Sequence, residues 1–196
     1  MPLPDAPPLP DFPVRDGDIP VCAEPAAAFR RATNNDLTFL RALYRSFRAD
    51  EFASLAWSPE QIRVFLDQQF DLQHRSYVVT FPQADFLLIL WEGMPVGRLY
   101  LDASHDHWHI VDIGLTSERR NGGLGFAVMQ AVKRHAQASA AAGIALHVAC
   151  DNQGAQRFYR RLGFREVARE EPTCARMVWT PEPDAVAGQV ALPAVN

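Results

Sequence analysis

The sequence predicts an α/β protein built on one mixed, twisted sheet of six to seven strands, with helices on both faces. Three observations lead to this fold class. Apolar segments with strand and helix spacing alternate in the order β-α-α-β-β-β-α-β-α-β-β, which is typical of a mixed sheet. A glycine-rich turn separates one apolar strand from a long, alanine-rich helix. The chain of 196 residues is 48% hydrophobic, which is enough for one domain with its own core.

The first half of the chain is expected to form a strand, two helices and three strands, over residues 29–32, 35–49, 58 to about 74 or beyond, 85–91, 96–102 and 107–115. Thr33 offers an N-cap for the first helix, whose apolar residues recur at helical spacing. The second helix has a clearer start, because Ser58 and Gln61 have capping-box spacing and Pro59 suits the first turn. A turn at Gly93 joins the next two strands, and the third strand is apolar enough to be central in the sheet.

The second half is expected to alternate helices and strands over residues 123–142, 145–150, 152–162, 164–169 and 174–179. Gly143 is expected to stop the long helix, because glycine suits the C′ position. Gly163 is expected to end the helix of residues 152–162 for the same reason. The last two strands should close the fold as an antiparallel pair.

The two ends of the chain differ in composition from the middle. Eight of the fifteen prolines lie within residues 1–25, and proline fixes φ and lacks an N–H. Residues 1–27 are therefore expected to form a flexible, extended or disordered arm. Residues 181–196 combine prolines and alanines without periodicity and are expected to form a flexible tail. One folded domain is predicted over residues 28–180.

Charge and cysteine content restrict the partners and the compartment. A net charge of −4 argues against a nucleic-acid partner, gives no sign of membrane attraction, and suits a neutral or cationic partner such as an amine. Cys22, Cys150 and Cys174 are odd in number and scattered, which indicates reduced thiols. The N-terminal segment lacks the features of a signal peptide, and no apolar run approaches the ~20 residues of a membrane span. We therefore expect a cytoplasmic protein.

The run Arg120-Asn121-Gly122-Gly123-Leu124-Gly125 follows an apolar strand and opens a helix. The N-terminus of a helix has free N–H groups and the positive end of the helix dipole, so it stabilises an anion. Glycines let phosphate oxygens approach the backbone, and Arg119 adds positive charge. The turn could also serve only to shape a tight loop. A dinucleotide or P-loop site is disfavoured, because neither motif occurs at the required place.

Two motifs carry a resemblance to a known family. The pattern Arg120-x-x-Gly123-x-Gly125 resembles the acetyl-CoA signature of the GNAT acetyltransferases. The segment from Asn152 to Phe164 is similar to that family's Asn-x-x-Ala-x-x-x-Tyr-x-x-x-Gly-Phe segment. The resemblance covers roughly residues 29–180. It implies the GNAT acyl-CoA N-acyltransferase fold, with acetyl-CoA as co-substrate and no metal.

The resemblance also implies roles for particular residues. In the family the fourth strand diverges from the fifth and leaves backbone groups free for the pantetheine arm, which here are those of Ile113, Gly114 and Leu115. The turn of residues 120–125 would hold the pyrophosphate. Along the pantetheine arm would lie Asn152, Ala155 and Phe158. Tyr159 would lie near the sulfur and protonate the departing CoA thiolate as a general acid.

The general base is less defined, because histidines stand where many family members have glutamate. His147 is preferred, since it lies on the strand that opens toward the thioester, and His109 is the alternative. By strict alternation Asp112 would lie on the opposite face of its strand from His109, and it is a third candidate. Proton loss through a chain of waters, without a dedicated base, also stays open.

Three other groups of residues carry chemistry outside the two motifs. His105, His107 and His109 alternate along a strand, but exposed histidines near a hairpin are ordinary, and a metal site is not expected. An acceptor pocket could form from the residues Asp50, Glu51, Trp57, Gln73, His74 and Tyr77. Cys150 could act as a nucleophile, although direct transfer makes a thiol unnecessary.

The resulting expectation is an acetyl-CoA-dependent N-acyltransferase that moves an acetyl group to a primary amine by direct attack. The acceptor could be a small molecule or a protein, and the enzyme a monomer or homodimer. The alternative is a non-catalytic module that binds acyl-CoA as a sensor or scaffold.

Overall fold

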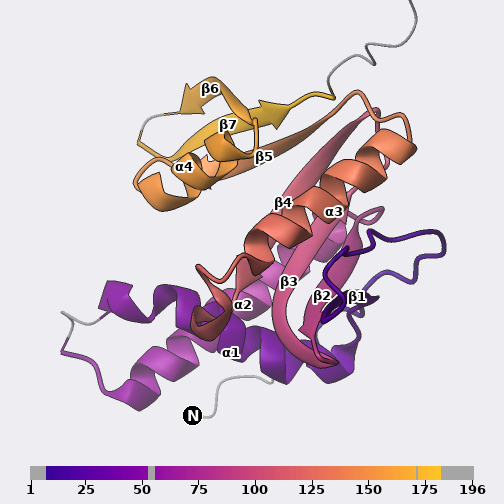
Figure 1. The fold of residues 1–196 in the computed structure, drawn as a ribbon. Helices are drawn as coiled ribbons and strands as arrows, with labels where there is room; N and C mark the ends of the chain where they lie inside the picture. Colours follow the sequence, from indigo (N-terminus) through magenta and orange to yellow (C-terminus); the bar gives the residue numbers. More distant parts are fainter. Residues whose placement is uncertain (1–7, 53–55, 171, 182–196) are drawn as a thin grey trace, which may run out of the picture.

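The computed structural model describes residues 8–52, 56–170 and 172–181. Seven strands form one sheet, and four α-helices pack on it (Figure 1). The strands are β1 (Ala27–Arg31), β2 (Asp85–Trp91), β3 (Met94–Asp102), β4 (His107–Leu115), β5 (Gly143–Ala149), β6 (Arg165–Glu170) and β7 (Cys174–Trp179). The α-helices are α1 (Leu37–Arg48), α2 (Pro59–Thr80), α3 (Leu124–Ala138) and α4 (Gln153–Arg161), and three short 3-10 helices are η1 (Asn34–Asp36), η2 (Ala49–Phe52) and η3 (Ser117–Arg119).

The sheet has the strand order β1-β2-β3-β4-β5-β7-β6, so the predicted mixed sheet is confirmed. Among the described strands, β4 and β5 form the only parallel pair. Their pairing covers only the first half of β4 and stops at Ile110 and Leu146. Beyond that point the two strands diverge, as Figure 1 shows. Within the described parts of the chain, no strand therefore lies beside the C-terminal half of β4 on the β5 side.

An irregularity in β4 changes which face its residues occupy. Tyr100 of β3 pairs with Asp112, whereas the next residue, Leu101, pairs with Ile110, so Val111 is the extra residue of a β-bulge. Before the bulge, Ile110 faces the core under α3. After it, Asp112 faces α2, where Tyr77 lies beside its carboxylate.

The core consists of two apolar layers, one on each face of the sheet. One layer joins β2–β5 and β7 to α3 and α4, and the other joins the opposite face to α1 and α2. Helices on both faces are thus confirmed. The central position predicted for β4 is also confirmed, since it is the fourth of seven strands.

The helix ends show where local signals succeed and where one fails. The capping box of Ser58 and Gln61 is formed, and α2 continues to Thr80. The expectation that Gly143 stops α3 is wrong. The helix ends at Ala138, and Ala140 takes the left-handed conformation with φ 54° in a Schellman-like ending, in which the Ala141 N–H donates to the Ala136 carbonyl. Gly143 instead starts β5, where an added Cβ would lie 2.7 Å from the Trp179 carbonyl oxygen.

The N-terminal segment from residue 8 to residue 26 has no helix or strand, in agreement with its proline content, but it lies against the domain. Phe12 is buried between His74 and Phe86, at ring-centroid distances of 4.7 and 5.4 Å. Further along, Ile19 and Cys22 pack against the α3 side of the core. The segment therefore contacts both faces of the sheet. Residues 1–7 of the predicted arm, and residues 182–196 of the predicted tail, lie outside the described residues.

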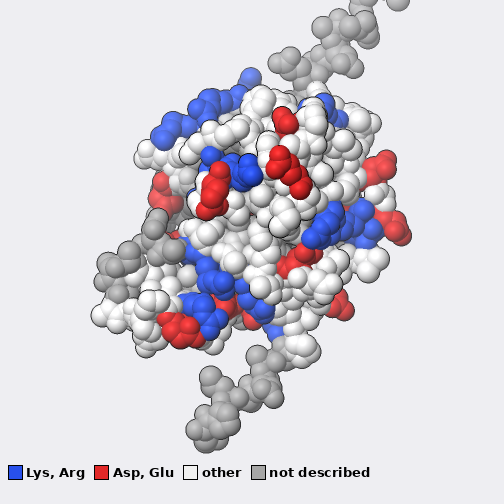
Figure 2. All heavy atoms as spheres, turned by 60° about the horizontal axis from the view of Figure 1, so that its bottom comes forward, with Lys and Arg blue, Asp and Glu red and all other residues white. Residues whose placement is uncertain are grey.

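The surface carries charges of both signs. On the face shown in Figure 2, Lys and Arg alternate with Asp and Glu. Several of these charges form ion pairs, such as those that join α1 to α2 through Arg41 with Asp71 and Arg45 with Asp67. Within the part of the chain that the structure describes, none of the helices has the length and apolar character needed to cross a membrane.

Candidate active site

The divergence of β4 and β5 opens a cavity of ≈ 300 Å³. Its walls come from both strands, from α2 and from α4. The lining residues are Tyr77, Ile110, Val111, Asp112, Ile113, Leu146, His147, Val148, Ala149, Asn152, Ala155 and Tyr159. The sequence placed Ile113, His147, Asn152, Ala155 and Tyr159 in one site, and the structure brings all five to this cavity.

A larger groove of ≈ 690 Å³ runs between the start of α3 and α4. Its lining residues are Leu115, Arg120, Asn121, Gly123, Gly125, Phe126, Gly154, Ala155, Phe158, Arg161 and Leu162. Ala155 borders both the groove and the cavity. A long, narrow ligand in the groove could therefore reach the cavity past this residue.

The glycine-rich turn forms one end of the groove. Asn121 and Gly123 take left-handed conformations, with φ of 60° and 87°, and Gly123 is the N-cap residue of α3. An added Cβ at Gly122 or Gly123 would meet open space. The first N–H groups of α3 have no partner within the helix and lie beside this space. The turn is therefore a concave site suited to an anion.

The other residues of the predicted turn have different surroundings. Leu124 is buried in the core under α3, so only its backbone can serve the groove. Gly125 lies against Phe158, where an added Cβ would be in ordinary van der Waals contact with the ring, at 3.5 Å. The Arg120 guanidinium stacks on Phe47 at 5.2 Å and donates from Nε to the Leu115 carbonyl at 3.0 Å.

The predicted strand residues are divided between two faces. Ile113 borders the cavity and Leu115 borders the groove. Gly114 faces α1 instead, and an added Cβ there would lie 2.3 Å from the Phe47 ring. Its contribution to a ligand in the groove is limited to backbone atoms.

Helix α4 supplies the remaining predicted residues. Asn152 is its N-cap, and the side-chain oxygen accepts a hydrogen bond from the Ala155 N–H at 3.0 Å. The amide nitrogen of Asn152 keeps its donors for other partners. Phe158 faces the groove, and Tyr159 is buried against the cavity. Burial, with a smaller contribution from the charge of Asp112, raises the pKa of Tyr159, so its hydroxyl stays protonated at neutral pH.

The two histidines considered as bases lie together on the α2 side of the sheet. Their ring centroids are 5.6 Å apart, nearly perpendicular. His147 is exposed and borders the cavity, whereas His109 does not border it and packs against Phe81 at 5.5 Å. Burial and the neighbouring His147 lower the pKa of His109.

Asp112 differs from the expectation in its position. It was expected on the opposite face from His109, but the bulge at Val111 puts both on the α2 side. Its carboxylate accepts a hydrogen bond from Arg98 at 2.7 Å, and the Arg98 side chain is 2% exposed. The carboxylate of Asp112 is therefore already engaged by a buried guanidinium.

Arg98 was missed by the sequence reasoning. It also donates to Gln73, and its guanidinium lies over the rings of Phe47 and Tyr100 at 5.7 and 5.4 Å. A signal existed, since Arg98 is the single cation in an apolar strand that is central in the sheet. Buried charges of this kind are retained only with partners.

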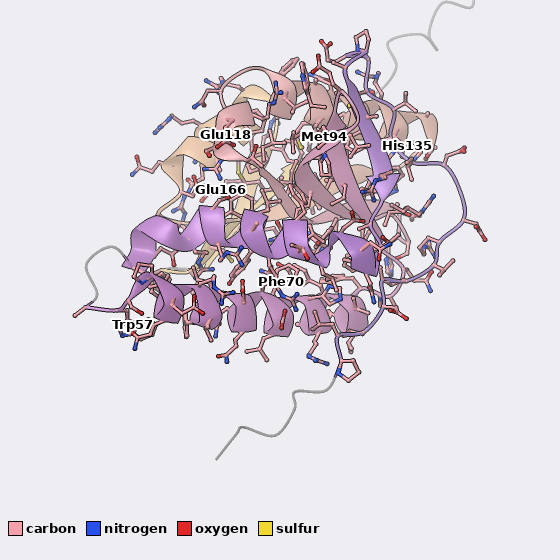
Figure 3. The ribbon with its side chains drawn as sticks, turned by 90° about the horizontal axis from the view of Figure 1, so that it is seen from below. Trp57, Phe70, Met94, Glu118, His135 and Glu166 are labelled. Atoms are coloured by element: carbon pink, nitrogen blue, oxygen red, sulfur yellow. The ribbon has the colours of Figure 1, made fainter. Side chains whose placement is uncertain are left out.

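The expected acceptor pocket does not form as one site. Tyr77 borders the cavity, but Gln73 serves Arg98, and His74 faces the N-terminal segment, with its Nε2 2.8 Å from the Pro10 carbonyl. Trp57 lies at the far end of α2, beyond Phe70, which packs between α1 and α2 (Figure 3). There it borders a separate hollow of ≈ 440 Å³.

Glu51 pairs with Arg48. The side chain of Asp50 lies outside the part of the chain that the structure describes. The histidines near the β3–β4 hairpin are not clustered as ligands: within the described residues, no three His, Cys, Asp or Glu side chains are placed to hold a metal ion. Within the described residues, Cys22, Cys150 and Cys174 form no disulfide bond.

The comparisons with known proteins agree with this geometry. A search of curated protein sequences finds none that matches the chain. Solved structures do match. The PaiA N-acetyltransferase of Thermoplasma acidophilum, in complex with coenzyme A, has a TM-score of 0.63 and 16% identity over 79% of this chain and 99% of its own. RimL, a ribosomal L7/L12 alpha-N-protein acetyltransferase in complex with coenzyme A, has a TM-score of 0.58 and 17% identity over 83% and 98%.

A third similar structure, FdhC, is described as a nucleotide-linked sugar GNAT, with a TM-score of 0.59 and 12% identity over 84% of this chain and 91% of its own. At these identities the likeness establishes the fold. The sequence adds the family, because residues 40–164, more than half of the chain, match the acetyltransferase (GNAT) family. The chain is therefore a member of the GNAT acetyltransferase family.

Proposed function

We propose that this protein transfers an acetyl group from acetyl-CoA to a primary amine by direct attack of the amine. The observation that carries the proposal is the meeting of groove and cavity at Ala155, with Tyr159 and His147 both lining the cavity. Residues of the α3–α4 side would bind the acetyl donor. Residues of the α2 side would receive the amine.

The groove fits the parts of coenzyme A. The turn at Gly123 and the free N–H groups of α3 suit the pyrophosphate, with Arg120 beside it. Ala155, Phe158 and the uncovered edge of β4 suit the pantetheine arm, whose amides can pair with strand backbone. Bound in this way, acetyl-CoA supplies a thioester carbonyl, which the amine attacks.

Tyr159 is proposed as the general acid. Since burial raises its pKa, the phenol is fully protonated at neutral pH and can donate to the sulfur as the C–S bond breaks. Backbone N–H groups of Ile113 to Leu115 are proposed to donate to the acyl oxygen as negative charge develops on it.

His147 is proposed as the group that takes the amine proton. Of the three candidates, His109 does not border the cavity, and the carboxylate of Asp112 is already paired with Arg98. His147 borders the cavity, is exposed to solvent, and can pass the proton on to water. Imidazole is suited to this task near neutral pH.

The test combines binding and turnover. We expect acetyl-CoA to bind in calorimetry and to be consumed with some class of amine, detected as free thiol. Tyr159→Phe should lower kcat by about 10²–10⁴-fold with the Kd for CoA unchanged, and His147→Gln should lower it more than His109→Gln. Absence of binding at millimolar acetyl-CoA would refute the proposal. Tight binding without turnover of any amine would favour a CoA-binding module without catalysis.

A further inference from the structure

A row of aromatic rings lines the approach to the cavity on the α2 side. Tyr77 and Phe81 come from α2 and its C-cap, His109 from β4 and His147 from β5, and these four residues are called here the aromatic wall. Adjacent rings are in contact, with centroid distances of 6.3 Å from Tyr77 to Phe81, 5.5 Å from Phe81 to His109, and 5.6 Å from His109 to His147. The wall is thus one continuous surface.

The wall is accessible where it meets the cavity. Tyr77 and His147 border the cavity directly, and His147 is exposed. Phe81 and His109 are half-buried, so each keeps part of its ring available. The buried ring of Tyr100 lies 6.0 Å from Tyr77 and supports the Tyr77 end of the wall. A flat apolar group could therefore pack against rings that are already held in place.

The charges around the wall do not favour a polycation. Asp112 has the one carboxylate among the described residues that line the cavity, and Arg98 pairs with it. Arg176 is the β7 partner of His147 in the sheet and lowers the pKa of His109. The carboxylate of Asp102 acts on His109 in the opposite direction. The nearby charges are balanced, so an acceptor with several ammonium groups would gain little there.

We propose that the acceptor is a primary monoamine with an aromatic body, which packs on the aromatic wall and directs its nitrogen past His147 into the cavity. This inference rests on the proposed function. In the transfer, the N–C bond forms at the acetyl carbonyl carbon and the C–S bond breaks. His147 takes one proton from the nitrogen and Tyr159 gives one to the sulfur, so the products are an N-acetyl amide and CoA thiol. Both side chains then exchange protons with solvent.

The hollow at Trp57 is a less suitable acceptor site. Gln61, which borders it, precedes Tyr77 by sixteen residues on the same helix, so the two lie about 24 Å apart along the helix axis. An amine bound beside Trp57 would be too far from the cavity to react. This makes Trp57 a useful control position.

The experiment compares kcat/KM for 2-phenylethylamine, hexylamine, spermidine and kanamycin at saturating acetyl-CoA, by thiol release. We expect kcat/KM for phenylethylamine to be about tenfold higher than for hexylamine, because its ring gains two contacts with the wall. The difference from spermidine and kanamycin should be larger. Phe81→Leu should lower kcat/KM for phenylethylamine more than kcat/KM for hexylamine, and so remove most of the preference. Tyr77→Phe should keep the preference, because the ring remains, and Trp57→Leu should change neither value.

The outcomes separate the two proposals. If acetyl-CoA binds but no amine is acetylated, the proposed function fails. Three results would leave acetyl transfer standing and overturn the aromatic-acceptor inference. In the first, spermidine or kanamycin is the best acceptor. In the others, Phe81→Leu lowers kcat/KM for both monoamines equally in a folded protein, or Trp57→Leu abolishes the preference for phenylethylamine.

Discussion

Replacing Gly123 by alanine separates what the glycine does for folding from what it does for ligand binding. Gly123 has φ of 87° and lies beside the groove, with open space where a Cβ would be. Gly93, in the β2–β3 turn, has φ of 79° and equally open space, but it does not border the groove. Gly93→Ala is therefore a matched control with the same backbone conformation and no expected ligand.

The expected stability change is small and equal in the two variants. A left-handed conformation costs a non-glycine residue about 1–2 kcal/mol, and the lower entropy of the unfolded chain returns about 0.4–1 kcal/mol. A net loss of about 0.5–1 kcal/mol corresponds to a fall in Tm of about 1–4 °C for a chain of this size.

The expected binding change differs. At Gly123 the methyl group would occupy space beside the helix N–H groups that we assign to the pyrophosphate. Loss of one charge-assisted hydrogen bond costs about 1.5–3 kcal/mol, which is about a 10- to 150-fold rise in the Kd for CoA. Calorimetric titration of both variants, with thermal unfolding in parallel, measures the two effects. Equal CoA affinity in Gly123→Ala and Gly93→Ala would refute the assignment of this turn to the pyrophosphate.

Three further predictions concern stability. Phe12→Ala should lower the free energy of unfolding by about 1.5–3 kcal/mol in urea denaturation, because the ring is buried against the domain; no change would show that the N-terminal segment does not stabilise the fold. Arg98→Met leaves the half-buried Asp112 without its ion-pair partner and should cost about 1.5–3 kcal/mol, and adding Asp112→Asn should recover part of that loss. Burial lowers the pKa of His74 in the folded protein. The contribution of the neutral His74 ring to the free energy of unfolding is therefore fully present above its ordinary pKa near 6.5, and it is lost as the pH falls through the lower, folded-state pKa. The free energy of unfolding should therefore decrease from pH 7 to pH 5, and His74→Leu should flatten that slope.

The fold could be predicted wherever a local signal has one structural solution. The start of α2 is one such signal, because its capping-box hydrogen bonds join Ser58 to Gln61 and depend only on the four residues 58–61. Gly143 was misread because a glycine after an alanine-rich helix suits two roles. Here Ala140 takes the left-handed conformation, and Gly143 is needed for close contact with β7, a strand more than thirty residues away in sequence.

The sequence predicted the residues of the candidate site that belong to the glycine-rich turn and to the segment from Asn152 to Phe164. Asn152 is the N-cap of α4, and Tyr159 follows seven residues later within the helix. Residues at this spacing share a helix face, and both therefore reach the cavity. Arg98 was not predicted, and Tyr77 was assigned only to an acceptor pocket, because their contacts with Asp112 depend on tertiary packing of β3 and α2. Strict alternation failed at Asp112, since nothing in the composition of β4 marks the extra residue at Val111.

That extra residue has a consequence for how the length of β4 is constrained. Upstream of Val111 the even-numbered positions Trp108 and Ile110 enter the α3 layer, and downstream the odd-numbered positions Ile113 and Leu115 do so. Deleting Val111 would remove the bulge, and the downstream residues would keep their faces, because Asp112 would then follow Ile110 in regular alternation. A strand of the present length that alternated regularly through Val111 would instead exchange the two layers for its whole downstream half. Asp112 would then lie among apolar side chains and Ile113 would face the buried guanidinium. At the present length of β4, the bulge therefore keeps the donor side and the acceptor side of the cavity apart.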